Sequence, residues 1–322
     1  MTIRPFVTDP ILTAVAIGYT NTAAMRIADR VLPRTPVAAE TFKWTHYPIE
    51  EAFNTPETLV GRRGQVQQLE FGGEERESAV EDHGLDSSIP NSDIQAANEA
   101  RSRGVTIHDP EKHATMMLTE TIENAREARV GQMVFNADNY AVGRKEVLSG
   151  TDQFSDYDNS DPIEVLKDAG NSTLIYRPNT HVYGREAWSK IASHPKLVNA
   201  VKGNVTGSGM ISMEQYVQLF SGEGVTQVLV GDGWVNTAKR GQPVNLQRAW
   251  GKHCALLYLD PIATTQGGVT FGFTAELGGR IAGRIEDPDV GLQGGVRIRA
   301  GERVKELIVA EDVGYFIQNV IA

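Results

Sequence analysis

The chain has 322 residues, of which 40% are hydrophobic and 22% are charged, proportions that are ordinary for a folded globular protein. Acidic residues outnumber basic ones by 41 to 31, and the net charge of −10 argues against a protein that binds DNA by neutralising its phosphates. A single cysteine, Cys254, excludes a disulfide framework and fits a reducing cytoplasm. The longest early apolar stretch, residues 11–18, is too short to span a bilayer, so we expect no signal or membrane segment.

Residues 1–40 have no strong periodicity, and we interpret them as an N-terminal arm. The pattern of residues 14–31 allows a helix capped by Asn21 or Thr22. Pro33 and Pro36 favour an extended chain after it.

Residues 41–85 are predicted to form an extended loop. Residues 41–47 alternate in a way typical of a strand, and a second strand is predicted at residues 65–71, after the glycine turn at 61–64. Between Glu70 and Asp86 seven carboxylates accompany one arginine. A hairpin with so little apolar surface is marginal alone, so we expect it to lie on neighbouring copies of the chain.

The clearest element is a helix at about residues 109–137. Asp109 suits the cap, Pro110 the first helical position and Glu111 the positive end of the helix dipole. The residues predicted to form its apolar face are Ala114, Met117, Leu118, Ile122, Ala125, Val130, Met133, Val134 and Ala137. The residues assigned to the opposite, polar face are Lys112, Glu120, Glu123, Arg126, Glu127 and Arg129.

After residue 139 the pattern is mixed α/β. Helices are predicted from Ser160-Asp161-Pro162 onward and at residues 181–191, 195–201 and 213–220. Strands are predicted at residues 172–176, 227–230 and 254–259, with a polar loop at 236–247. From residue 267 the alternation predicts an antiparallel sheet, and the last apolar strand at 313–321 needs a partner strand.

Motifs for chemistry are few. The chain has no phosphate-binding loop, and neither HExxH, GxSxG nor CxxC occurs. Cys254 lies in an apolar run and is expected to be an inert buried thiol, while Gly207-Ser208-Gly209 only superficially resembles a nucleophile turn. His108 and His113 are better explained by a helix start than by a metal site. Arg297, Arg299 and Arg303 form a basic stripe that faces either solvent or a neighbour's acidic patch.

The sequence as a whole resembles the major capsid proteins of tailed bacteriophages with the Hong Kong 97-type fold. The segments that carry this resemblance, in order, are residues 58–64 (TLVGRRG), 81–86 (EDHGLD) with 89–90, 160–163, 193–197 (SHPKL), 230–238, 249–252 (AWGK) and 314–317 (GYFI). Each segment is weak alone, and their order over nearly the whole chain makes the resemblance specific.

The resemblance implies an α+β fold with an N-terminal arm (1–40), an extended β-hairpin loop (41–85), a peripheral domain (86–158 and 268–322) with the spine helix, and an α/β axial domain (159–267). It also implies that the C-terminus completes the sheet of the peripheral domain. It also implies a structural protein of the virion, assembled in the host bacterial cytoplasm. Copies would form the hexamers and pentamers of an icosahedral shell around double-stranded DNA, without binding that DNA specifically. Loops such as 236–247 would meet at the centre of each capsomer.

A separate scaffolding protein and a portal are expected as partners, a decoration protein is left open, and neither cofactor nor membrane is expected. The residues predicted to contact other subunits are Arg62, Arg63, Glu74, Glu75, Glu77, Arg297 and Arg299. Two alternatives remain. One is an encapsulin-like shell around a cargo enzyme, and the other is a cytosolic α/β hydrolase using Ser208 or Cys254.

Overall fold

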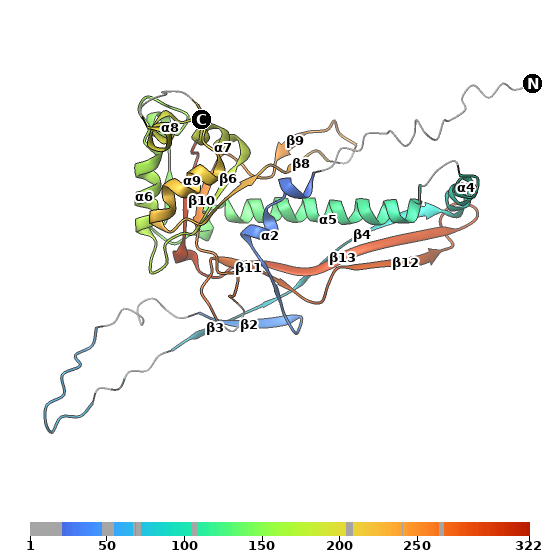
Figure 1. The fold of residues 1–322 in the computed structure, drawn as a ribbon. Coiled ribbons are helices and arrows are strands. Elements are labelled where there is room, and N and C mark those ends of the chain that lie inside the picture. The colour runs from blue at the N-terminus through green and yellow to red at the C-terminus, as the bar shows by residue number, and fades with distance from the viewer. Residues whose placement is uncertain are drawn as a thin grey trace, which may run out of the picture.

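The computed structural model describes residues 21–46, 55–66, 68, 72–104, 108–203, 209–239, 241–263 and 267–322. These residues form an elongated molecule in which one long helix, α5 (Pro110–Val134), lies along a sheet and ends against a second, α/β unit (Figure 1). The Asp109 carboxylate accepts hydrogen bonds from the backbone N–H groups of Glu111 (3.2 Å) and Lys112 (3.4 Å), which confirms the predicted cap. The helix continues through Gly131, where a Cβ would lie 2.6 Å from the carbonyl oxygen of Ala249, so this close approach requires a glycine.

The apolar face of α5 follows a four-residue spacing. Its buried residues include Ala114, Leu118, Ile122, Val130 and Val134, as predicted. Met117 and Ala125 were assigned wrongly, because both are exposed. Arg126 and Glu127, which were assigned to the polar face, are buried, and Arg126 completes the four-residue spacing between Ile122 and Val130.

Beneath α5 lies the peripheral sheet, which is built around the 14-residue strand β13 (Gly295–Ile308). The other strands of this sheet are β1 (Arg34–Pro36), β4 (Glu81–Pro90), β11 (Gly272–Glu276) and β12 (Ile281–Asp287). Val296, Ile298 and Ala300 of β13 pack against Leu118 and Ile122 of the helix, as alternation in a half-buried strand requires. The expected antiparallel sheet after residue 267 is therefore confirmed.

The N-terminal part of the peripheral sheet was only partly predicted. Residues 81–85, assigned to the extended loop, belong to β4, which is antiparallel to β13 from Glu81↔Val304 to Pro90↔Gly295. The helix α4 (Asn91–Ser102) was not predicted. It has no buried residue, so its sequence lacks the apolar stripe from which a helix is predicted.

The extended hairpin is formed by β2 (Thr41–His46) and β3 (Glu74–Ala79), and it projects from the body (Figure 1). The first strand confirms the prediction for residues 41–46, while Tyr47 lies outside the described residues. The second strand was predicted at residues 65–71, of which 65, 66 and 68 are described and are not in a strand. The prediction failed because β3 is acidic and almost wholly exposed, and such a strand has no apolar alternation to reveal it.

The α/β unit contains the second five-stranded sheet, in the order β5-β14-β10-β6-β7. Its strands are β5 (Lys145–Val147), β6 (Thr180–Gly184), β7 (Gln227–Gly231), β10 (Cys254–Leu257) and β14 (Gly314–Gln318). Its helices are α6 (Pro162–Ser172), α7 (Arg185–Ala192), α8 (Pro195–Lys202) and α9 (Met213–Phe220). Alternate residues face two cores, since Leu256 packs with the helices of this unit, and Ala255 packs with Val130 and Val134 of α5.

Several predictions for this unit were wrong. Residues 181–184 are a fully buried strand and not a helix, and residues 172–176 form no strand. The C-terminal strand was expected to complete the peripheral sheet, but β14 pairs with β10 and β5 of the α/β unit. Its apolar run needs burial on both faces, which the centre of this sheet provides and a half-exposed sheet does not.

Residues 21–36 form a strap across α5, and we use this name for them below. The strap contains the short helices η1 (Ala23–Met25) and α2 (Ala28–Val31) and ends in β1, parallel to β11. The helix that residues 14–31 were expected to contain, capped by Asn21 or Thr22, is divided in the described part into η1, which follows Thr22 without a side-chain capping hydrogen bond, and α2. Ile27, Val31 and Leu32 are buried in the core of the same chain, so this part of the predicted arm packs on its own subunit.

The polar loop after residue 236 joins β8 (Trp234–Asn236) to β9 (Leu246–Arg248). This hairpin lies beside α5, and Asn21 of the strap pairs with the backbone N–H (3.0 Å) and carbonyl (2.8 Å) of Trp234. The meeting of this loop with its copies at the centre of a capsomer, which the resemblance implies, stays a prediction.

Candidate functional site

The residues predicted to contact other subunits are found at two places on the surface. Arg62 and Arg63 lie in an exposed turn closed by a 2.8 Å hydrogen bond from the Gly64 N–H to the Gly61 carbonyl. Figure 1 shows that this turn is far from the body of the molecule. Neither arginine forms an ion pair with another described residue.

The acidic residues of the hairpin lie closer to its base. Glu75 of β3 pairs with Lys43 of β2 at 2.6 Å, and Glu74 pairs with Arg76 at 3.2 Å. Glu77 is exposed on the same strand. These pairs are in water, where an ion pair adds little stability, so the strand keeps an acidic surface.

Arg297 and Arg299 lie on the outer face of the peripheral sheet, opposite the carboxylates of the neighbouring strand β4. The Arg299 guanidinium donates two hydrogen bonds of 2.8 Å to the Asp86 carboxylate, and Arg303 pairs with Asp82 at 3.2 Å. Arg297 pairs with Asp287 and, at 3.9 Å, with Asp86. The hydrogen bond from Arg299 lowers the pKa of Asp86. The basic stripe and two carboxylates of the acidic patch, Asp82 and Asp86, thus meet within one subunit, and contact of Arg297 and Arg299 with a neighbour stays a prediction.

The strap is held on α5 by a buried charge network that the sequence did not reveal. We use this name for Asp29, Arg34, Arg126, Arg129, Glu276, Glu302 and Glu306. Arg126 pairs with Asp29, lies 3.7 Å from Glu306, and donates a 2.9 Å hydrogen bond to the Thr274 hydroxyl. Its side chain is only 3% exposed, and burial lowers its pKa. Glu306 also accepts from Arg129 at 2.9 Å.

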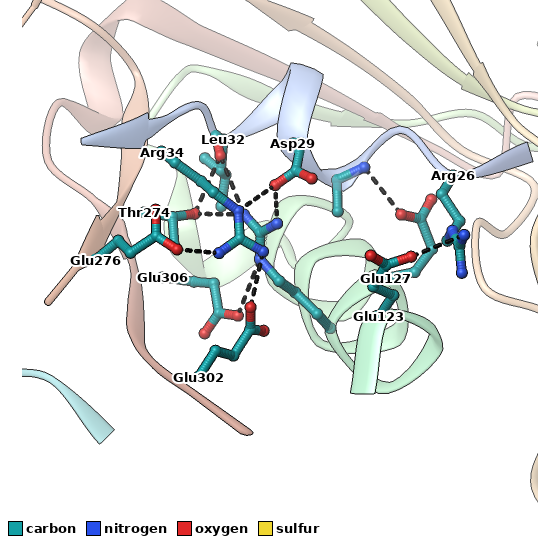
Figure 2. A network of polar contacts seen from close by, with 12 residues as sticks. Arg26, Asp29, Leu32, Arg34, Glu123, Glu127, Thr274, Glu276, Glu302 and Glu306 are labelled. Carbon is teal, nitrogen blue, oxygen red and sulfur yellow. Dashed lines mark hydrogen bonds and ion pairs between the residues drawn. The ribbon is translucent and has the colours of Figure 1, made fainter. Parts of the chain in front are cut away.

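Arg34 extends the buried charge network to the sheet (Figure 2). Its guanidinium pairs with Asp29 of the strap (2.9 Å), Glu276 of β11 (2.8 Å) and Glu302 of β13 (2.9 Å). The Glu302 side chain is 1% exposed. Removing one partner from such a buried set leaves a charge uncompensated, at a cost of about 3–5 kcal/mol. The network therefore fixes the strap to both α5 and the sheet.

Glu127 makes the second anchor of the strap. Its carboxylate accepts hydrogen bonds of 2.9 Å from the backbone N–H groups of Ile27 and Ala28 at the start of α2. It also accepts one of 2.5 Å from the indole N–H of Trp250. A carboxylate at a helix N-terminus accepts hydrogen bonds from the free backbone N–H groups, and its negative charge is stabilised by the positive end of the helix dipole.

Of the two residues named for a hydrolase, Cys254 lies in the described part of the chain and is not arranged for catalysis. Cys254 is 0% exposed, and burial raises its pKa, so its thiolate is not available. Ser208 lies outside the described residues. Buried Ser160 and His194 are 3.1 Å apart, but the Lys196 N–H donates to Nδ1 of His194. Nε2 of the neutral ring therefore carries the proton and donates to Ser160, so His194 cannot act as its base.

In the parts of the chain that the structure describes, no cluster of three or more His, Cys, Asp or Glu side chains is arranged to hold a metal ion. His108 and His113 are ring neighbours, with centroids 5.5 Å apart. None of the described helices combines the length and the hydropathy needed to cross a membrane.

Comparison with known proteins identifies full-length relatives, although no protein-family model matches the chain. The chain is 43% identical over 322 residues to the major capsid protein of Pseudomonas phage JBD67, with 100% of both chains covered. It is 25% identical over 329 residues to the major capsid protein of Burkholderia phage BcepMu, covering 98% of this chain and 97% of that protein.

Solved structures with the same fold include a phage-related protein from Bordetella bronchiseptica, with a TM-score of 0.69 and 20% identity over 97% of both chains. The capsid structure of Cyanophage P-SCSP1u matches with a TM-score of 0.60 and 8% identity, covering 94% of this chain and 91% of that one. The predicted α+β capsid fold is confirmed. On the full-length identity of 43% and this shared fold, the chain belongs to the phage major capsid proteins of the Hong Kong 97-type fold.

Proposed function

We propose that this chain is the shell subunit of a tailed-phage head, whose copies assemble as hexamers and pentamers around the double-stranded DNA genome. The full-length relatives named major capsid protein support this function. The observation that carries it within the molecule is the projecting hairpin loop, which buries almost nothing of its own. Leu59 is 84% exposed and Val66 is 76% exposed in that loop, beside Arg62 and Arg63.

Exposed apolar side chains on a projecting loop are stabilised when another surface removes them from water. We infer that the turn around Arg62 and Arg63 contacts an adjacent subunit. Glu74, Glu75 and Glu77 of β3, together with Arg297 and Arg299 of the peripheral sheet, are the further contact candidates. Their intrachain pairs are exposed, so exchange for pairs with a neighbour would cost little.

The remaining parts of the proposal follow from charge and family. A net charge of −10 suits a wall that encloses DNA without binding it. The role is structural and not catalytic. A scaffolding protein and a portal are the expected partners, and assembly in the host cytoplasm precedes incorporation into the virion. The divisions at 1–40, 41–85, 86–158 with 268–322, and 159–267 are kept as the proposed domains, although β14 lies in the sheet of the axial domain.

The test is to express the chain with its neighbouring gene products and to examine the particles by negative-stain microscopy and nucleic-acid analysis. Closed shells with a portal and packaged DNA are expected. Shells that contain a cargo enzyme and no DNA would favour the encapsulin-like alternative. A chain that stays monomeric under all conditions would contradict the proposal.

A further inference from the structure

The strand β12 is an outer strand of the peripheral sheet and has one free edge. Among the described strands only β13 pairs with it, in an unbroken register from Ile281↔Gly301 to Asp287↔Gly295. In Figure 1 β13 lies between β12 and β4. Every residue of β12 except Asp287 is exposed. One row of backbone N–H and C=O groups on β12 is therefore available to another strand.

The two outer strands beside β13 differ in how well they discourage such pairing. Folded proteins protect free edges with charged side chains, proline or bulges. The strand β4 carries the carboxylates of Glu81, Asp82 and Asp86. The strand β12 has neither proline nor a bulge, and on its face away from α5 Ile281 is 58% exposed and Ile285 is 43% exposed. The edge of β12 is therefore the one that gains more from a partner strand.

Gly283 lies midway between the two exposed isoleucines. A glycine inside a strand weakens that strand, because it loses more backbone freedom on folding than other residues do. Nothing in the described part of the subunit requires a glycine here, since its φ is not in the left-handed region and a Cβ would meet no atom within 4 Å. A glycine of this kind often marks the place where another backbone approaches closely.

The sequence of β12 is complementary to itself when two copies run antiparallel about Gly283. Residues that are opposite each other in an antiparallel pair share a face, so Ile281 would meet Ile285 of the second copy. Arg280, which directly precedes the strand, would meet Glu286, whose side chain is 84% exposed. Two apolar pairs and two pairs of opposite charge would therefore form together.

A shift of the axis by one residue loses this match. An axis at Arg284 would place two like charges opposite each other, and an axis at Ala282 would place Arg280 opposite Arg284. We propose that β12 pairs with β12 of a second copy across a two-fold axis at Gly283, which joins two peripheral sheets into one. With this axis Arg284 lies opposite the small Ala282 and keeps its 3.4 Å pair with Glu111 of α5.

The proposed axis suits a wall built from copies of one chain, and in this respect the inference rests on the proposed function. The axis is perpendicular to the joined sheet, because opposite residues share a face, so both α5 helices lie on the same side of it. A shell requires this, since every subunit presents the same face outward. A two-fold contact is also closed, so it joins subunits in pairs and leaves their other surfaces free to form rings.

The first test uses Ile281→Cys/Ile285→Cys in the full-length chain, expressed with its neighbouring gene products. Within one strand these positions are about 13 Å apart at 3.3 Å per residue, which is too far for a disulfide. A disulfide must therefore join two chains, and the double variant should give covalent dimers after oxidation. Each single variant is the matched control and should give none, because its cysteine would face an isoleucine. Cys254 is buried and should not interfere.

The outcomes of this test separate the strand pairing from the proposed function. Closed particles in which the double variant forms no covalent dimers would overturn the pairing and leave the proposed function intact. Covalent dimers without closed particles would support the pairing and contradict the proposed function. Dimers from the single variants, or a ladder of longer covalent chains, would overturn the two-fold register.

The second test adds a charge at the proposed axis. Gly283→Lys places two lysines opposite each other, so the yield of closed particles should fall several-fold. The urea midpoint of the subunit should not change, because a Cβ at this position meets no atom of its own chain within 4 Å. Leu292→Lys, at a fully exposed residue between β12 and β13, is the matched control and should assemble normally. An undiminished particle yield from Gly283→Lys would contradict pairing at this axis.

Discussion

The strap and the tip of the hairpin loop both present arginines, but they use them in opposite ways. Arg34 and Arg126 of the buried charge network meet carboxylates of the same chain at a site where Arg126 and Glu302 are almost fully enclosed. Arg62 and Arg63 lie in an exposed turn with no ion pair recorded within the described part of the chain. The first arrangement holds one subunit together, and the second leaves charge available for another molecule.

The difference follows from how much surface each region buries. The strap inserts Ile27, Val31 and Leu32 into the core, so its polar groups lose water and must find partners in the same chain. The loop keeps its polar groups in water, and they need no internal partner. Mutations should therefore affect folding in the first region and assembly in the second.

The largest loss of stability is expected for Arg126→Met. Glu306 keeps Arg129 and Asp29 keeps Arg34, but the four carboxylates of the network are then left with two arginines at a site where the Glu302 and Glu306 side chains are 1% and 5% exposed. This excess of buried negative charge should lower the free energy of unfolding by about 3–5 kcal/mol. Urea unfolding of the monomer measures this. Arg103→Met, at a side chain that is 73% exposed, is the control and should leave the midpoint nearly unchanged. A loss below about 1 kcal/mol would show that the network rearranges into water.

The next effect is a pH dependence in the α/β unit. Burial lowers the pKa of His181 from 6.5 to about 3, while its Nδ1 lies 2.8 Å from the Tyr216 hydroxyl. The unfolded chain takes up the proton first as the pH falls, so this stability is present above pH 6.5 and is lost between pH 6.5 and 3. At about 1.4 kcal/mol per pH unit, roughly 2–3 kcal/mol is lost by pH 4.5.

His181→Phe isolates that contribution. The variant cannot take up a proton at this position, and Tyr216 keeps its 2.7 Å hydrogen bond with Tyr183. The difference in unfolding free energy between the original chain and the variant should shrink as the pH is lowered from 7 to 4.5. A difference that stays constant over this range would mean that His181 is not held neutral.

A smaller effect is expected for Glu127→Gln. The amide keeps the shape of the side chain but replaces one acceptor oxygen of the α2 cap with a donor, at a cost of about 1–2 kcal/mol. Hydrogen exchange of the Ile27 and Ala28 amides should accelerate more than exchange in α6. Equal acceleration in both helices would instead indicate a general loss of stability.

Sequence patterns predicted the helices that have both a capping residue at the start and a periodic apolar face. The start of α5 at Asp109-Pro110 and of α6 at Asp161-Pro162 were predicted because the caps and the apolar periodicity agree. The strand β3 and the helix α4 were missed because an exposed element needs no apolar pattern. The prediction of which sheet β14 joins was wrong, because a partner strand that is distant in the chain leaves no signal in the local sequence.

The candidate site was less predictable than the fold. Arg126 was assigned to the polar face by residue type, although its spacing of four from Ile122 and from Val130 places it in the buried stripe. That four-residue spacing was the feature of the sequence that could have indicated the burial of Arg126. The partners in the sheet, such as Glu302 and Glu306, are more than 170 residues away in the chain, so they could not be inferred from the spacing within the helix.

The most direct measurement compares Arg62→Glu/Arg63→Glu with Arg126→Met in two assays, urea unfolding of the subunit and the yield of closed particles when the chain is expressed with its neighbouring gene products. The loop variant should unfold at the same urea concentration as the original chain and yield far fewer particles. The Arg126 variant should unfold at a clearly lower urea concentration. Full particle yield from the loop variant, or unfolding of both variants at the same lowered midpoint, would contradict the division between the charges that fold the subunit and those that join it to others.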